Sequence, residues 1–319
     1  TVRAPSGHSY ILVNGQKVTI DTSALIVNGR TYLPIRAVFE AFGAQVGWNN
    51  STRCASVTTG TPTLQVHFIN VGQGDAALID YGNVEVLIDG GDNKAGPTLV
   101  SYLSSYIDGP LDYVIATHPD ADHVGGLDDV LAAFQVNEVI DSGRSSTTKT
   151  YQQYWTAAVN EPNSILSYDE NRTIPLGVNT VLSIIETGDN WDNSNNSSVV
   201  CQLTCGNVKV LFPGDISDTV ERASLHLFGD VDVLKVPHHG SKTSSCMEFL
   251  QVIKPEYAVA SYAVGNSYHH PTSQALQRLI SMGTTVFGTG KSGTVILSTD
   301  GHTYSFNTNQ ALTLADAGA

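Results

Sequence analysis

One turn, within residues 117–127, constrains this chain more than any other feature of its sequence. It follows an apolar strand that is predicted to begin at residue 113, and it precedes a helix predicted over 126–134. Within six residues the turn holds two histidines and two aspartates: His118, Asp120, Asp122 and His123. Capping a helix needs only one such side chain, so four of them at the end of a strand predict a metal site. Alternate side chains can bind one ion while the other two face a second.

The composition limits which molecules the chain can bind and where the chain can function. With a formal net charge of −14, the chain lacks the excess of Lys and Arg that holds nucleic acid by charge alone. Bound divalent cations can still supply local positive charge for a phosphodiester. The low charged fraction of 14%, with abundant Ser, Thr and Asn, is typical of exported proteins. No apolar run is long enough to span a membrane, and because the sequence starts at Thr1 without a leader, we expect a mature chain whose signal peptide, if any, has been removed.

The four cysteines, Cys54, Cys201, Cys205 and Cys246, show no CxxC spacing, which argues against a thiolate zinc site. Cys201 and Cys205 fall on one predicted strand, too far apart for a disulfide. We expect free thiols, and a disulfide between cysteines distant in the sequence is the alternative.

Residues 1–60 have the pattern of a small module of hairpins and one helix. Asn-Gly turns at residues 14–15 and 28–29 predict hairpins, Pro34 opens a helix that ends at Phe42 before Gly43, and a last hairpin turns at residues 49–50. The segment resembles the N-terminal domain of copper amine oxidases, through residues 13–15 (VNG), 27–37 (VNGRTYLPIRA), 42–44 (FGA) and Trp48. This resemblance implies a stalk or wall-association module of a Gram-positive type bacterium. The segment has no His or Cys cluster for copper, so we expect a structural or adhesive role.

A polar linker at residues 59–63 precedes the larger part of the chain, in which strands and helices alternate. Between residue 139 and residue 177 the sequence is polar, with one predicted helix at 151–159. The other predicted helices lie at 98–107, 126–134, 217–227 and 273–282, and the predicted strands at 64–70, 76–81, 84–89, 113–117, 180–186, 198–204, 208–212, 231–236, 257–261, 285–287 and 293–298.

The ligand-rich turn resembles the HxHxDH signature of metallo-β-lactamase fold hydrolases, with Asp120 in place of the middle His. The added oxygen ligand makes Mn²⁺ more competitive with Zn²⁺. Two further strings follow that family's order: residues 87–91 (LIDGG), whose Asp89 would orient a ligating imidazole, and residues 212–216 (FPGDI), whose Asp215 would bridge two metals. The resemblance implies an α+β fold, a four-layer αββα sandwich, with a small N-terminal α+β module and domains at residues 1–60 and 64–319.

Three more strings narrow the family: residues 70–76 (NVGQGDA), 235–244 (KVPHHGSKTS) and 266–271 (NSYHHP). Together with the metal turn they resemble the β-lactamase-like domain of the competence DNA-uptake proteins of the ComEC family, over about residues 64–300. In that family the last string usually reads Asn-x-Tyr-Gly-His-Pro, so His270 aligns with its His. The resemblance implies a phosphodiesterase that acts on DNA. ComEC proteins also have many membrane helices, which this chain lacks, so a role in uptake does not follow.

The resemblance also implies a set of metal ligands for two divalent cations, Mn²⁺ or Zn²⁺. We expect the first to be held by His118, Asp120 and Asp215, and the second by Asp122, His123, Asp215 and one late histidine, either His238 or His270. The fold's third histidine is replaced by residues 195–198 (NNSS), so the first site has few ligands and is expected to fill with substrate or at high metal concentration. Asp89, Asp75 and Asn196 would support the ligands from behind; for Asp75 a role in a structural turn is an equal alternative.

A cluster of hydrogen-bond donors follows the predicted strand at 231–236. It contains His238, His239, Ser241, Lys242, Thr243 and Ser244, and it is expected to hold the scissile phosphate and stabilise developing charge, unless its histidines are structural. Two ions roughly 3.5–4 Å apart would share a hydroxide that attacks phosphorus. His239 is a candidate acid for the leaving alkoxide, and Asp122, His238, His239 and Lys242 form the expected catalytic set.

The sequence therefore predicts a secreted or surface-held, metal-dependent phosphodiesterase that acts on DNA, with the cell wall as a second partner through the N-terminal module. One alternative is a cell-wall phosphoester of the teichoic-acid type, which suits that module. Another is lactam or other acyl hydrolysis, which the missing third histidine disfavours. A non-catalytic surface-binding protein is the last alternative, and the intact ligand turn speaks against it.

Overall fold

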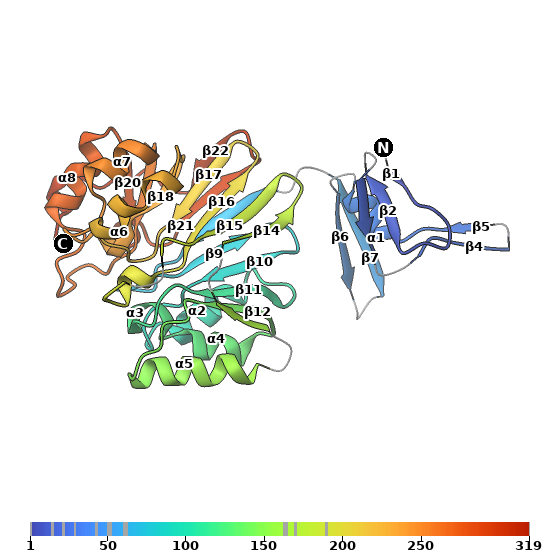
Figure 1. The fold of residues 1–319 in the computed structure, drawn as a ribbon, viewed down its shortest axis with the longest axis horizontal. Helices are drawn as coiled ribbons and strands as arrows, with labels where there is room; N and C mark the ends of the chain where they lie inside the picture. The colour runs from blue at the N-terminus through green and yellow to red at the C-terminus, as the bar shows by residue number, and fades with distance from the viewer. Residues whose placement is uncertain are drawn as a thin grey trace. The chain divides into compact units, whose positions relative to one another are not determined.

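A computed structural model describes residues 2–13, 16–20, 23–28, 30–41, 44–49, 53–59, 63–161, 165–168, 171–188 and 191–318 (Figure 1). The chain divides into two compact units, Thr1–Thr63 and Leu64–Ala319. Each unit has its own sheets, and the candidate metal ligands all belong to the second.

The first unit consists of short strands and one short helix. Strands β1 (Val2–Arg3), β2 (Tyr10–Val13) and β3 (Gln16–Thr19) form one sheet, β4 (Leu25–Val27) pairs with β5 (Arg30–Tyr32), and β6 (Ala44–Asn49) pairs with β7 (Cys54–Thr59). The helix α1 (Ile35–Glu40) begins where Pro34 predicts it. Asn28 has the left-handed φ of 50° that the predicted second turn requires, whereas residues 14–15, Gly29, Phe42, Gly43 and Asn50 lie outside the described residues. Ile35 and Phe39 of this helix are 47% and 39% exposed.

The second unit contains two large sheets. The order of the first sheet is β13-β12-β11-β10-β9-β8-β21-β22, and that of the second is β14-β15-β16-β17-β18-β19-β20. The strands of the first are β8 (Leu64–Phe68), β9 (Ala77–Asp80), β10 (Glu85–Ile88), β11 (Leu111–Ala116), β12 (Val136–Asp141), β13 (Ile165–Tyr168), β21 (Val295–Thr299) and β22 (Tyr304–Phe306). Those of the second are β14 (Arg172–Gly177), β15 (Thr180–Ile185), β16 (Val200–Cys205), β17 (Val208–Phe212), β18 (Val233–Lys235), β19 (Tyr257–Ala260) and β20 (Thr285–Gly288).

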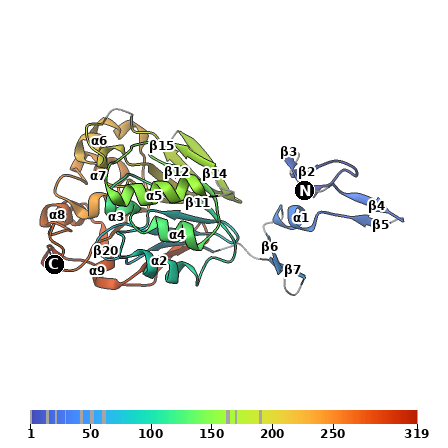
Figure 2. The ribbon, with the colours of Figure 1, turned by 90° about the horizontal axis from the view of Figure 1, so that it is seen from below.

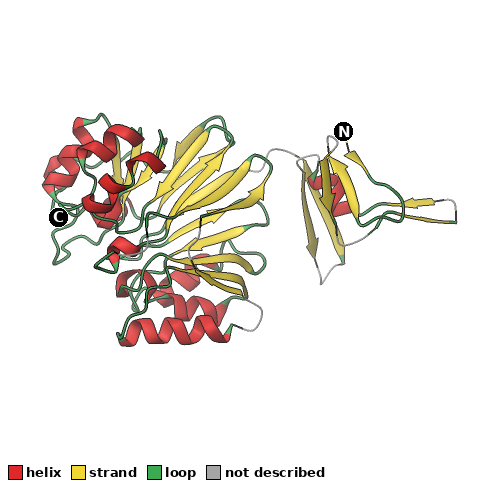
Figure 3. Ribbon diagram, viewed as in Figure 1, coloured by secondary structure: helices red, strands yellow, loops and turns green. Residues whose placement is uncertain are grey.

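Three clusters of buried apolar residues join the layers of this unit: one lies between the two sheets, and the other two lie between each sheet and the helices on its outer face (Figures 2 and 3). Alternate residues of both sheets, such as Phe68 and Phe212, meet in the core between the sheets. The outer face of the first sheet packs against α2 (Gly96–Leu103), α4 (Leu127–Ala133) and α5 (Lys149–Asn160). The outer face of the second packs against α6 (Asp218–Ala223), α7 (Met247–Ile253) and α8 (Ser273–Ser281). The layers thus run helix, sheet, sheet, helix, and the predicted four-layer αββα sandwich is confirmed.

Several elements differ from their sequence prediction. The ligand turn contains a short helix, α3 (Ala121–Val124), and α7 was not predicted. The stretch expected to be polar between residues 139 and 177 holds two strands, β13 and β14. In β14 the buried residues alternate with exposed ones, Pro175 is one of the exposed ones, and the pairing with β15 shifts register between Pro175 and Gly177. Because β14 is the edge of its sheet, the missing N–H of this proline is tolerated.

Cys201 and Cys205 lie on β16, and none of the four cysteines forms a disulfide within the part of the chain that the structure describes. Among the described residues, no helix combines the length and the apolar character needed to cross a membrane.

Candidate metal centre

The candidate ligands follow the carboxyl ends of four strands, two from each sheet. Asp89 follows β10 and His118 follows β11, which are parallel neighbours in the first sheet. Asp215 follows β17, and His239 lies in a 3₁₀ turn (Pro237–Gly240) after β18; these strands are parallel neighbours in the second sheet. The carboxyl ends of parallel neighbours lie at one edge, so each sheet contributes a pair of adjacent loops.

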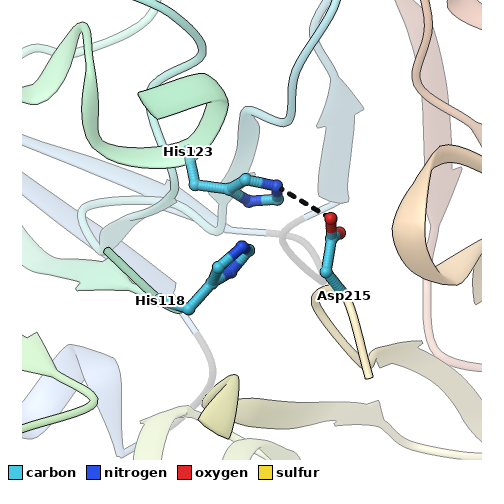
Figure 4. A group of neighbouring side chains, drawn as sticks. All are labelled: His118, His123 and Asp215. Atoms are coloured by element: carbon cyan, nitrogen blue, oxygen red, sulfur yellow. Dashed lines mark ion pairs between the residues drawn. The ribbon is translucent and has the colours of Figure 1, made fainter. Parts of the chain in front are cut away.

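His123 joins the loops of both sheets (Figure 4). Its Nδ1 lies 2.8 Å from Asp89 Oδ2, and its Nε2 lies 3.3 Å from Asp215 Oδ2. Asp89 is itself fixed, because its Oδ1 accepts Thr117 N at 2.8 Å and its Oδ2 accepts Thr117 Oγ1 at 2.7 Å. A carboxylate on Nδ1 holds that nitrogen protonated and directs Nε2 towards the interior of the site. The structure thus places the Asp89 carboxylate on the far side of the His123 ring from Asp215.

His118 is buried beside His123, with the ring centroids 4.0 Å apart. Its Nδ1 lies 3.1 Å from Thr117 Oγ1 and 3.3 Å from Ser198 Oγ. Burial, and then the charge of His123, lower the pKa of His118 to about 4. His118 is therefore neutral at physiological pH, which is the form that binds a metal.

His239 enters the cluster from the second sheet. Its Nε2 lies 3.3 Å from Asp122 Oδ2 and 3.5 Å from Asp215 Oδ2, while its Nδ1 lies 3.1 Å from the Ser261 carbonyl and 3.2 Å from Asp75 Oδ1. Its φ of 53°, after a φ of 50° at His238, curls the turn so that the ring lies inside. The sequence predicts a role in proton transfer for His239, and the structure groups its ring with side chains that could hold a metal ion.

Asp75 lies behind His239 much as Asp89 lies behind His123. The second oxygen of Asp75 forms a buried ion pair with Lys235 Nζ at 2.6 Å, and this lysine was not singled out from the sequence. Asp75 N donates to the Asp122 carbonyl at 3.0 Å. The neighbouring Gly74 has a φ of +137°, and a Cβ there would lie 2.4 Å from that carbonyl. Only glycine permits this close approach, so both expected roles of Asp75, structural turn and support, are compatible with its contacts.

Five buried atoms of the cluster have no hydrogen-bond partner among the described residues. They are Asp75 Oδ1, His118 Nε2, His123 Nε2, His239 Nε2 and Asp215 Oδ1. Ligand atoms of His118, His123 and Asp215 lie within 4.8 Å of one another, as do those of Asp122, His123 and His239, and those of Asp75, Asp215 and His239. Buried polar atoms without partners are rare. Imidazole nitrogens and carboxylate oxygens that converge in this way fit one or two divalent cations.

The electrostatics of the cluster favour a cation in the same place. Burial alone would lower the pKa of His239, but the charges of Asp215 and Asp75 and the nearby carboxylate of Asp122 outweigh it and raise the pKa to about 10. The pKa of His123 is likewise raised, by Asp215 and Asp89, against the effect of burial. The carboxylates thus hold protons on both imidazoles, and a divalent cation replaces such protons when it binds.

Other predicted ligands lie at the margin of the cluster. Asp120 Oδ2 is 4.0 Å from His118 Nε2, and Asp120 Oδ1 accepts Ser194 Oγ at 2.8 Å. His238 Nε2 is 3.8 Å from Asp215 Oδ2. His270 is buried, its ring centroid 5.7 Å from that of His238, and its Nδ1 has no hydrogen-bond partner. Among the described residues, none of the close groups of three contains these side chains.

Asn196, expected to support the ligands, accepts Ser217 N at 2.9 Å and so fixes the loop that follows Asp215.

In the loop expected to hold phosphate, residues 238–244, the hydroxyl groups form hydrogen bonds within the loop itself. Ser241 Oγ and Thr243 Oγ1 share a hydrogen bond of 2.9 Å, and Ser244 Oγ donates to the Pro237 carbonyl at 3.0 Å. Lys242 is exposed, and its carbonyl accepts Arg278 Nη2 at 3.1 Å. A role for this loop in binding phosphate stays a prediction.

Comparison with known protein families gives two matches. Residues 69–264 match the metallo-beta-lactamase superfamily, and residues 1–60 match the copper amine oxidase N-terminal domain. The ComE operon protein 3 of Bacillus subtilis is 29% identical over 252 residues, which cover 72% of this chain and 32% of that protein. The Recombination protein 2 of Haemophilus influenzae is 30% identical over 238 residues, which cover 73% of this chain and 29% of that protein. The chain spans about a third of the length of these relatives.

Solved structures share the fold. The metallo-beta-lactamase fold protein YhfI of Bacillus subtilis has a TM-score of 0.52 at 13% identity, over 75% of this chain and 100% of that one. The metallo hydrolase Igni18 of Ignicoccus hospitalis has a TM-score of 0.51 at 16% identity, over 73% of this chain and 98% of that one. The two stacked sheets, the loops that converge at one edge and the family match agree, and the chain belongs to the metallo-beta-lactamase superfamily.

Proposed function

We propose that this protein is a metal-dependent phosphodiesterase that cleaves DNA, with two divalent cations, Mn²⁺ or Zn²⁺, as cofactors. The observation that carries the proposal is the convergence of buried, unpartnered ligand atoms of His118, His123, His239 and Asp215 from both sheets. Divalent cations bound there would supply a nucleophilic water at neutral pH and neutralise charge on a phosphoryl group.

The chain's own residues orient that centre. Asp89 holds the Nδ1 atom of His123, and the Ser261 carbonyl holds the Nδ1 atom of His239 with Asp75 beside it, so that both Nε2 atoms are directed at Asp215. Asp122 Oδ2, 3.3 Å from His239 Nε2, comes from the partly exposed side of the cluster. A substrate therefore approaches from the side of Asp122 and Asp120, whose side chains are partly exposed.

DNA is the substrate that the relatives favour. One of them is named for recombination, and the family match over residues 69–264 contains His118, His123, Asp215 and His239. Residues 1–60 match a separate domain, and we propose that this unit holds the hydrolase at the cell wall of a Gram-positive type bacterium after secretion.

The test is cleavage of plasmid and single-stranded DNA by protein stripped of metal, with Mn²⁺, Zn²⁺ or Mg²⁺ added back. Asp122→Ala is compared with Asp112→Ala, because both carboxylates are partly buried and Asp112 lies at the opposite end of β11. We expect metal-dependent cleavage that Asp122→Ala abolishes and Asp112→Ala retains.

Metal bound in stoichiometric amounts without cleavage of either DNA would refute the nuclease and favour a cell-wall phosphoester as substrate. Equal losses in both variants would show that the effect comes from folding and not from the metal centre.

A further inference from the structure

We propose that a groove beside the metal centre binds one single-stranded segment of nucleic acid, with Arg144 on a phosphate and Trp155 against a base. The inference rests on the proposed function and names the strand form that the site accepts. It starts from two adjoining cavities that the metal ligands do not use.

The first cavity borders the metal centre. It has a volume of about 190 Å³, and its lining includes Arg144, Thr187 and Ser198. Ser198 Oγ lies 3.3 Å from His118 Nδ1 and accepts Asp215 N at 3.0 Å. A group bound in this cavity would therefore contact Ser198, which itself contacts the candidate ligands His118 and Asp215.

The second cavity continues from the first through Gly143, which lines both. It has a volume of about 480 Å³, and Tyr151, Gln152 and Trp155 of α5 contribute to its wall. The helix α5 packs against α3, which carries Asp122 and His123 (Figure 2). The groove thus runs from Ser198, which contacts His118, to the outer helix α5.

An aromatic pair stands in the second cavity. The rings of Tyr151 and Trp155 are stacked, with centroids 6.0 Å apart and planes at 17°. Tyr151 is buried and fixes Trp155, which is only half-buried. A nucleobase stacks on such a ring whatever its identity, and the exposed amide of Gln152 beside it can bond to a base edge.

Arg144 supplies a positive charge in a chain whose net charge is −14. Its Nη1 donates to the Trp191 carbonyl at 3.1 Å, and the described residues place no carboxylate in an ion pair with it. A guanidinium held by a neutral carbonyl keeps its charge and further N–H groups for a phosphate.

These contacts select a single strand. In a duplex the bases stack on one another inside the helix, so none is available to Trp155 unless it is unpaired. A flexible strand can place one phosphate at the metal centre, another at Arg144 and a base on Trp155.

The test measures binding of fluorescein-labelled oligothymidine by anisotropy, in the Asp122→Ala background with Mn²⁺ present, so that no cleavage is needed. Trp155→Ala and Trp155→Phe are compared with Val159→Ala, an exposed position on the same helix. We expect Trp155→Ala to weaken binding about tenfold or more, and Trp155→Phe to restore most of it. Arg144→Gln should weaken binding and reduce the salt dependence by roughly 0.7 in logarithmic slope, the value for one contact with a single-stranded phosphate.

A second readout is the ratio of kcat/KM for an oligonucleotide to kcat/KM for bis(p-nitrophenyl) phosphate, which occupies only the metal centre. Trp155→Ala should lower this ratio at least fivefold. Equal binding by Trp155→Ala and Val159→Ala, or equal losses for duplex and single strand, would overturn the inference while metal-dependent cleavage of DNA stands. Binding that depends on Trp155 without any cleavage would instead overturn the proposed function and keep the groove.

Discussion

Replacing Asp89 with Asn tests how the site is oriented. The two oxygens of Asp89 accept three hydrogen bonds, from Thr117 N, Thr117 Oγ1 and His123 Nδ1, at 2.8, 2.7 and 2.8 Å. Asn has the same shape, and its side chain tolerates the left-handed φ of 60° at this position. Its amide can accept from Thr117 N, but its NH₂ group then faces two donors.

The consequence for metal binding follows from the tautomer of His123. Opposite an NH₂ group, Nδ1 becomes the acceptor and the proton moves to Nε2, which lies 3.3 Å from Asp215 Oδ2 and is the atom offered to a metal. Loss of such an orienting partner weakens metal binding about 10- to 100-fold, which is about 1.4–2.8 kcal/mol. The free energy of unfolding of the metal-free protein falls by about 1.5–3 kcal/mol as well, because a buried hydrogen bond to a charged group is lost.

The assay is a competition titration of metal-stripped protein against a chromophoric chelator, beside urea unfolding without metal. Asp112→Asn is the control, because this carboxylate accepts Glu85 N at 3.1 Å at the far end of β11. It should lower stability without changing metal affinity. If Asp89→Asn destabilises the metal-free protein but binds metal as tightly as the unaltered chain, the proposed orientation of His123 is refuted.

Two further predictions concern stability. Metal added at about a hundred times its Kd should stabilise the second unit by about 2.7 kcal/mol and raise its Tm by about 5–10 °C; an unchanged Tm in calorimetry would exclude a bound ion at these ligands. Glu85 is buried, and burial, followed by the charges of Asp108, Asp112 and Asp80, raises its pKa to about 8. Below pH 4.5 this group is protonated in both the folded and the unfolded chain, and between pH 4.5 and 8 the unfolded chain alone ionises freely, so stability falls through this window. In Glu85→Gln the decrease in the free energy of unfolding across this window should be smaller by about 2 kcal/mol, a value reduced for solvent screening. Urea unfolding at pH 5 and pH 9 measures the decrease. The same decrease in the variant and the unaltered chain would contradict the assignment of this pH dependence to Glu85.

Much of the fold was predictable because strand and helix patterns are local. The strand at 208–212 begins and ends as predicted, and the helix α8 differs from its prediction by one residue. The order of ligand-bearing strings along the chain was enough to predict the sandwich. What escaped prediction was locally ambiguous, such as β14 with its proline, or short, such as α3 within the ligand turn.

The candidate site divides in the same way. Four ligands of one turn, and carboxylates that end recognisable strands, were visible in the sequence. The placement of His239 was not, because it depends on the left-handed backbone of its own turn and on a long-range contact with Asp75. The ion pair between Asp75 and Lys235 likewise joins distant segments that carry no shared pattern.

The metal centre lies where the two sheets meet, with His118 and His123 supplied by the first and Asp215 and His239 by the second. Each half of the sandwich is therefore incomplete as a chelator, and neither fragment alone would hold an ion tightly. An ion bound there would join the two halves, so that opening one from the other would require breaking coordination bonds as well as separating the inner core. Metal supply would then set how cooperatively the sandwich unfolds and how long its edge strands resist proteases, through the ion's release rate and not through the amount of apolar surface that the fold buries.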